Sequence, residues 1–151
     1  MSDHFIFLVP RDPMFVPTDE VQRRVVGVLN RIAPNAESIS AEACAQVEFF
    51  DCGQNFERIL CPLCSAEIGI DWWQDRMSED IAVAGFRLDR YKAPCCAKSV
   101  NLNELNYDWP QAFGRFNWIV RNPNIGEITA AAKIELEAVA GFALVPIHQH
   151  V

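Results

Sequence analysis

The sequence has no long uninterrupted hydrophobic stretch. Its longest apolar runs, residues 5–10 and 141–147, fall far short of the roughly 20 residues that a membrane-spanning helix needs. The first residues also lack the basic region and long apolar segment of a secretory signal. We therefore expect a cytoplasmic protein that does not associate with a membrane.

Positive charge is also scarce. The 151-residue chain has 13 basic and 20 acidic residues, which gives a formal net charge of -7. A chain with this charge repels phosphate backbones, and this argues against general nucleic-acid binding. A protein partner, in particular a basic one, is the expected kind of ligand.

Residues of the common catalytic motifs are few. The sequence contains no Gly-rich phosphate loop, no His-Glu-x-x-His motif and no serine in a nucleophile elbow. Two of the three histidines, His148 and His150, would share one face of a strand and could supply half of a metal site, but solvated polar surface is the simpler interpretation. The acid pairs 19–20 and 79–80 are interpreted as solvated helix ends rather than as general acids or bases.

Cysteine is the one chemically distinctive residue type that the chain has in quantity. Six cysteines without a secretory signal favour metal binding over a disulfide framework. Zinc prefers four thiolate or imidazole ligands at tetrahedral corners, commonly supplied as two closely spaced pairs. The motif Cys61-Pro62-Leu63-Cys64 and the later pair Cys95-Cys96 fit this requirement, and the backbone N–H groups of residues 63–65 are free to bond the sulfurs. We therefore predict one zinc ion bound by Cys61, Cys64, Cys95 and Cys96.

This CPxC turn resembles the knuckle of zinc-ribbon and rubredoxin-like sites. The resemblance is limited to the cysteine segment, and it is shared with small bacterial proteins that carry a CPxC knuckle and a later Cys-Cys pair. Two features depart from the family pattern: Ser65 stands where a glycine at positive φ is usual, and the second pair is adjacent rather than separated by two residues. The fourth ligand is therefore open between Cys96 and Cys52. A redox-active CxxC pair, an iron–sulfur cluster and an open catalytic zinc site are the alternative interpretations.

Hydrophobic periodicity predicts the fold. Strands are expected at residues 4–10, 47–50, 56–60, 86–91, 100–105, 113–120 and 142–147, with helices at 18–33, 68–82 and 127–140. The outer elements have the order strand, helix, strand twice, which is typical of a split βαβ sandwich of ferredoxin-like topology. We thus expect an α+β protein with a single domain over residues 1–151 and a zinc-ribbon-like insertion at about 51–110. No internal sequence repeat is evident.

Two groups of residues are expected to support the metal segment. Trp72 and Trp73 are interpreted as apolar cover rather than as a ligand-binding pair. The basic residues near the second cysteine pair are interpreted as a counter-charge to a zinc tetrathiolate, which carries a net charge of -2; they are Arg87, Arg90, Lys92 and Lys98.

Three functional hypotheses follow. The first is a non-enzymatic, zinc-stabilised protein-binding module, and small acidic proteins of this type include immunity proteins that neutralise toxins. The second is a small-molecule enzyme that uses an open zinc site or a cleft. The third is a thiol redox sensor in which oxidation releases the metal and joins Cys61 to Cys64.

Overall fold

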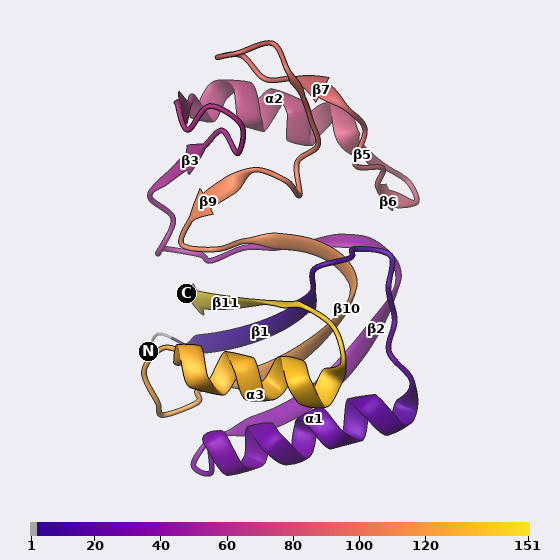
Figure 1. The fold of residues 1–151 in the computed structure, drawn as a ribbon, viewed down its shortest axis with the longest axis vertical. Helices are drawn as coiled ribbons and strands as arrows, with labels where there is room; N and C mark the ends of the chain where they lie inside the picture. The colour runs from indigo at the N-terminus through magenta and orange to yellow at the C-terminus, as the bar shows by residue number, and fades with distance from the viewer. Residues whose placement is uncertain (1–2) are drawn as a thin grey trace.

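The computed structural model describes residues 3–151, and a mixed six-stranded sheet lies at the centre of its α+β fold (Figure 1). The strand order is β11-β1-β10-β2-β6-β5. The four long strands β11, β1, β10 and β2 are antiparallel to one another, whereas β2 and the short strand β6 pair in parallel. The six strands are β1 (His4–Pro10), β2 (Ser38–Phe50), β5 (Ile81–Ala82), β6 (Gly85–Phe86), β10 (Ala112–Arg121) and β11 (Leu144–His150).

Two helices, α1 (Asp19–Ile32) and α3 (Ala130–Ala140), lie together on one face of this sheet (Figure 1). Each helix begins after a threonine whose hydroxyl accepts a backbone N–H bond, Thr18 from Val21 and Thr129 from Ala132. Helix α3 ends at Gly141, which adopts the left-handed conformation at φ 88° that glycine tolerates. Both predicted helices are confirmed, although α3 begins three residues later than predicted because the cap is at Thr129.

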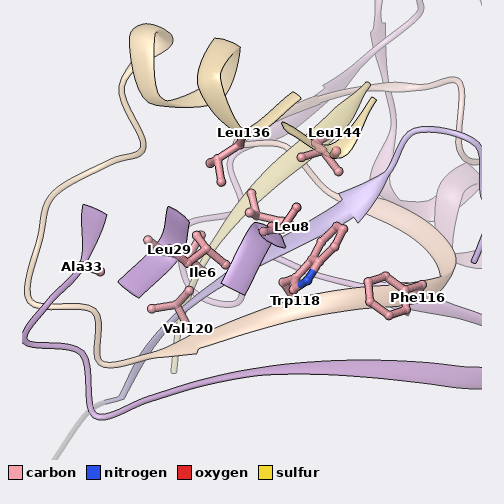
Figure 2. Close-up of a cluster of buried hydrophobic side chains, with 11 residues drawn as sticks. Ile6, Leu8, Leu29, Ala33, Phe116, Trp118, Val120, Leu136 and Leu144 are labelled. Carbon is pink, nitrogen blue, oxygen red and sulfur yellow. The ribbon is translucent and has the colours of Figure 1, made fainter. Parts of the chain in front are cut away.

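A buried cluster joins these helices to the sheet (Figure 2). Alternate residues of β1 and β10 point toward the helices, as the period of two in a strand requires. Figure 2 shows Leu29 of α1 and Leu136 of α3 beside these strand residues. The indole N–H of Trp118 donates a 3.2 Å hydrogen bond to the Gln22 carbonyl, so its polar atom is satisfied.

The segment between β2 and β10 covers the opposite face of the sheet (Figure 1). It contains α2 (Ile70–Asp80), a small sheet of β4 (Glu67–Ile68), β3 (Arg58–Leu60) and β9 (Asn106–Asp108), and a hairpin of β7 (Tyr91–Lys92) and β8 (Ser99–Val100). A second buried cluster joins Val47 and Phe113 of the large sheet to Ile59 and Leu102 of this segment. Within residues 3–151, no helix has the length and hydropathy needed to cross a membrane.

Three local predictions were wrong. The predicted strand at 86–91 is divided between β6 and β7, because Leu88 between them has φ 54° and the chain turns there. Only the start of the predicted strand at 100–105 is a strand, and β9 forms at Asn106–Asp108, where no strand was predicted. The Asp80 side chain bonds the backbone at Leu88 and Asp89, and β9 forms by pairing with the distant strand β3, so contacts between separate segments override local propensity at these two places.

Candidate metal centre

Cys61 and Cys64 lie in the turn of the hairpin formed by β3 and β4. Leu60 pairs with Glu67, and the turn is closed by hydrogen bonds from Cys61 N to Ala66 O (2.8 Å) and from Ser65 N to Cys61 O (3.0 Å). Ser65 has φ 65°, which confirms the expected positive φ at this position. The backbone N–H of Ser65 donates to the Cys61 carbonyl, and not to a sulfur as predicted.

Cys95 and Cys96 lie in a second hairpin, formed by β7 and β8, that repeats the first. Lys92 pairs with Ser99, and the turn is closed by bonds from Ala93 N to Lys98 O (2.8 Å) and from Ala97 N to Ala93 O (2.9 Å). Ala97 has φ 59° and is the counterpart of Ser65. The ten residues 59–68 thus correspond one by one to residues 91–100.

This structural repeat was missed in the sequence. Only the prolines, Pro62 and Pro94, and the cysteines Cys64 and Cys96 are identical between the two segments. What the segments share is a pairing register and a set of backbone hydrogen bonds, and many different side chains are compatible with both. A comparison of the two cysteine motifs aligned on their prolines would have revealed the correspondence.

The two turns bring four sulfur atoms together. All the Sγ atoms of Cys61, Cys64, Cys95 and Cys96 lie within 4.8 Å of one another. The Cys61–Cys96 separation is 3.9 Å and the Cys64–Cys95 separation is 3.2 Å. A tetrahedral zinc site with Zn–S bonds of about 2.3 Å has sulfur–sulfur distances of about 3.8 Å. The cluster therefore has the dimensions of a metal site.

The electrostatics of the cluster also favour a cation. Burial opposes ionisation of Cys61, but hydrogen bonds from the backbone N–H groups of Cys64 and Leu63, together with the neighbouring thiols, outweigh it and lower the pKa of Cys61 to about 7. The hydrogen bond with Cys64, burial and the nearby Cys61 raise the pKa of Cys95 to about 12. Without a cation the thiols thus resist ionising together, and a bound metal ion would remove this mutual repulsion.

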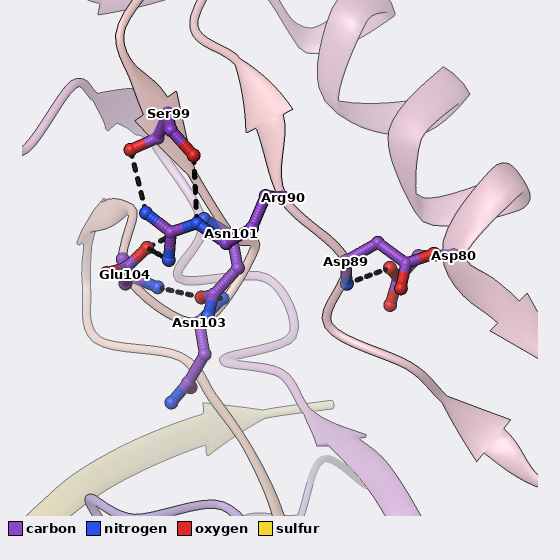
Figure 3. A network of polar contacts seen from close by, with 7 residues as sticks. All are labelled: Asp80, Asp89, Arg90, Ser99, Asn101, Asn103 and Glu104. Carbon is purple, nitrogen blue, oxygen red and sulfur yellow. Dashed lines mark hydrogen bonds and ion pairs between the residues drawn. The ribbon is translucent and has the colours of Figure 1, made fainter.

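The buried carboxylate of Asp80 holds the turn that leads into the second hairpin. The side chain of Asp80, at the end of α2, is 0% exposed and accepts hydrogen bonds from Leu88 N, Asp89 N and the Tyr91 hydroxyl, each at 2.8 Å. Figure 3 shows Asp80 facing the backbone of Asp89. The interpretation of the pair 79–80 as solvated acids is therefore wrong for Asp80, which holds the turn before β7.

Arg90 connects the strands of the second hairpin to the loop that follows. Its guanidinium donates to the Ser99 hydroxyl and carbonyl, both at 2.9 Å, and pairs with Glu104 (Figure 3). Glu104 also accepts a hydrogen bond from Asn101 N. Arg87 pairs with Asp89 at 2.9 Å. Both arginines are thus paired with carboxylates, and Arg90 also bonds the β8 strand of the hairpin through Ser99.

The two tryptophans are both part of the apolar cluster that contains Cys61. Trp73 stacks with Phe56, and its indole N–H donates a 3.0 Å hydrogen bond to the Tyr107 hydroxyl. The Arg76 guanidinium lies 5.6 Å from the centre of the Trp72 ring. This packing agrees with the interpretation of both residues as cover for the metal segment.

The other two cysteines lie outside this group. Cys52, the alternative fourth ligand, is fully buried, and its backbone N–H and thiol both bond the Gln111 side-chain oxygen. Burial raises the pKa of Cys52 to about 11. Cys44 packs partly against apolar residues, and its thiol also contacts Glu48 at 3.4 Å. The structure thus groups Cys96, and not Cys52, with the other three cysteines.

The histidines do not form a second metal centre. His148 Nε2 accepts a 3.1 Å hydrogen bond from Ile128 N, and the His4 and His150 rings lie 4.3 Å apart. Among residues 3–151, the four-cysteine cluster is the only group of three or more cysteine, histidine or carboxylate side chains with metal-binding spacing. Comparison with protein-family profiles, curated proteins and solved structures gave no match to this chain.

Proposed function

We propose that the four cysteines bind one structural zinc ion, and that the hairpins held by this ion form part of a surface that binds another protein. The observation that carries the proposal is the convergence of four sulfur atoms within 4.8 Å from two matching turns. Four thiolates in a tetrahedral set are typical of structural zinc. The reducing conditions of the cytoplasm, where we place the protein, would keep these thiols available for the metal.

Apolar side chains on the inserted segment support the protein-binding part of the proposal. Leu63 at the first turn is 51% exposed, Ile81 is 53% exposed and Val83 is fully exposed. Exposed apolar residues carried by a rigid element are common in protein interfaces. The net charge of -7 favours a basic partner, and an immunity-type protein that neutralises a toxin is one role with these properties.

We further infer that the chain is one domain with ferredoxin-like topology and a zinc-ribbon-like insertion. The strand order β11-β1-β10-β2, with α1 and α3 on one face, supports the ferredoxin-like assignment because it matches the order of a split βαβ sandwich. The two knuckle hairpins support the zinc-ribbon-like assignment.

Metal content is the direct test of the first step. Elemental mass spectrometry of the untagged protein should find one zinc ion per chain. Cys61→Ser and Cys96→Ser should lose the ion, whereas the matched control Cys52→Ser should retain it. Freshly reduced wild-type protein without metal would refute the structural zinc site.

Partner capture tests the second step. Zinc-loaded protein should retain a specific protein that a chelated sample and a Leu63→Asp, Val83→Asp double variant fail to retain. A second zinc-loaded variant, Ile134→Asp, changes an exposed apolar residue on α3 and should retain the partner. Equal capture by all four samples would contradict the role of the metal segment in binding.

A redox role is the second candidate, and one distance favours it. Cys64 and Cys95 are both exposed, and their sulfurs are 3.2 Å apart. Hydrogen peroxide would take two electrons from these thiols, giving a disulfide and two water molecules with release of the ion. Peptide mass mapping should then find Cys64 joined to Cys95, rather than the Cys61–Cys64 pair expected from the sequence. Retention of zinc under mild peroxide would exclude this role.

A further inference from the structure

The correspondence between the two hairpins shows that their cysteines are not in equivalent positions. In the first turn the sulfurs are supplied by Cys61, which begins the turn, and by Cys64. The second turn has Cys96 in the position of Cys64, but Ala93 in the position of Cys61. The remaining sulfur belongs to Cys95, which corresponds to Leu63.

Burial follows the position in the turn. Cys61 is 1% exposed and Ala93 is 2% exposed, and both belong to the same buried cluster. Leu63 and Cys95, which correspond to each other, are both exposed. Cys61, Cys64 and Cys96 thus occupy the first and fourth positions of a CPxC turn, which are its ligand positions. Cys95 occupies the third position of its turn, which holds Leu63 in the first turn.

We propose that position 93 is an unused ligand position, that Cys95 replaces it as the fourth ligand, and that Cys95 is the ligand that exchanges with external thiols. This inference rests on the proposed metal site. On this basis Cys61, Cys64 and Cys96 stay bound to the ion. The coordination position of Cys95 can be taken by the sulfur of an external thiol.

The surroundings of the two sulfurs give the physical reason. Cys61 is held in the buried cluster, and its sulfur receives the backbone N–H groups of Leu63 and Cys64. The equivalent N–H groups in the second turn belong to Cys95 and Cys96, and Ala93 has no sulfur to receive them. Cys95 is an exposed residue, whereas Cys61 is only 1% exposed.

The exchange step is a substitution without electron transfer. The bond between the ion and the Cys95 sulfur breaks, and a bond to the sulfur of the incoming thiol forms. The proton of the incoming thiol passes to Cys95, which leaves as a neutral thiol. The charge of the four-sulfur site is unchanged, and no oxidant or reductant is needed.

The test uses the full chain loaded with Co²⁺, because its absorption reports the number of bound thiolates, and 2-mercaptoethanol as the external thiol. Cys95→Ala should still bind one ion per chain, with an affinity lower by about 100-fold or more, since even supporting residues around a metal change affinity by about 10–100-fold. Adding 2-mercaptoethanol should restore the four-thiolate spectrum. The double variant Ala93→Cys, Cys95→Ala should recover the affinity and no longer respond to the added thiol. The control Ile134→Ala changes an exposed side chain on α3, outside the metal segment, and should behave as wild type.

Three results would overturn the inference. One is a Cys95→Ala spectrum identical to that of the wild type, which would show that Cys95 is not a ligand. The others are failure of the double variant to recover affinity and complete loss of the ion from Cys95→Ala. Wild-type protein that binds no metal would instead refute the metal site itself, so the two failures are distinguishable.

Limited alkylation of the zinc-loaded wild-type protein provides a second measurement that needs no variant. Among the four cysteines of the site, Cys95 should react first with N-ethylmaleimide, with the ion still bound after one modification. First reaction at Cys64, which is also exposed, would contradict the assignment of Cys95 as the exchanging ligand.

Discussion

Replacement of Asp80 by alanine tests how the metal segment is held together. The carboxylate is fully buried and accepts three hydrogen bonds at 2.8 Å, from Leu88 N, Asp89 N and the Tyr91 hydroxyl. A hydrogen bond to a charged group contributes about 1.5–3 kcal/mol, and a buried donor left without a partner costs about 1–3 kcal/mol. Because these effects overlap and water can enter the space, we expect Asp80→Ala to lower the free energy of unfolding by about 3–5 kcal/mol.

Urea unfolding of the zinc-loaded protein measures this loss, and hydrogen exchange locates it. The amides of Leu88 and Asp89 should lose protection, and zinc affinity should fall because the turn that leads into β7 is no longer fixed. The control is Glu79→Ala. Glu79 is adjacent in sequence, but its side chain is 55% exposed and pairs with Arg76 on the surface, so its loss should cost at most about 1 kcal/mol. Equal stabilities for the two variants, with unchanged exchange at Leu88 and Asp89, would refute the assigned role of Asp80.

Three further predictions address the two faces of the sheet. A strong chelator should remove protection from amides in residues 58–100 while leaving most of the helical circular dichroism, because the cluster around α1 and α3 contains no cysteine; complete loss of that signal would contradict separate stabilisation. Leu136→Ala, at a fully buried site, should lower the free energy of unfolding by about 2–5 kcal/mol in urea titrations, whereas Ile134→Ala, 68% exposed on the same helix, should change it by less than about 0.5 kcal/mol. Burial lowers the pKa of His148, and the smaller effect of Glu127 opposes this shift. The unfolded chain therefore binds the proton more readily than the folded chain does. Stability should fall as the pH drops below the ordinary histidine pKa of about 6.5. Urea midpoints between about pH 5 and 7.5 should show a smaller pH dependence in His148→Gln than in the wild type, and equal slopes would contradict this assignment.

The outer elements were predictable because their signals are local. Thr18 followed by Asp19 and Glu20 marks the start of α1, and the alternating residues Phe116, Trp118 and Val120 mark β10 as a strand. Both elements formed as predicted. The grouping of the four cysteines was also predicted, because the spacing of one pair and the ligand number of zinc together restrict which residues can meet.

The middle segment was harder to predict because its strands are only two or three residues long. Its β7 strand begins after a turn that Asp80 fixes from eight to eleven residues away, and no local pattern distinguishes Asp80 from the solvated Glu79. The repeat of the two hairpins was hidden for a similar reason, since it consists of backbone pairing rather than of shared side chains.

The sequence alone thus determined the elements with strong periodicity, the start of α1 and the presence of Cys61, Cys64 and Cys95 in one cluster, because each depends on neighbouring residues or on ligand chemistry. Only the tertiary structure decided that Cys52 lies apart, that Asp80 is buried and that Ala93 takes the position of Cys61. These three outcomes depend on how segments far apart in the chain pack against one another. Burial and register are properties of that packing, and a single pattern of residues does not specify them.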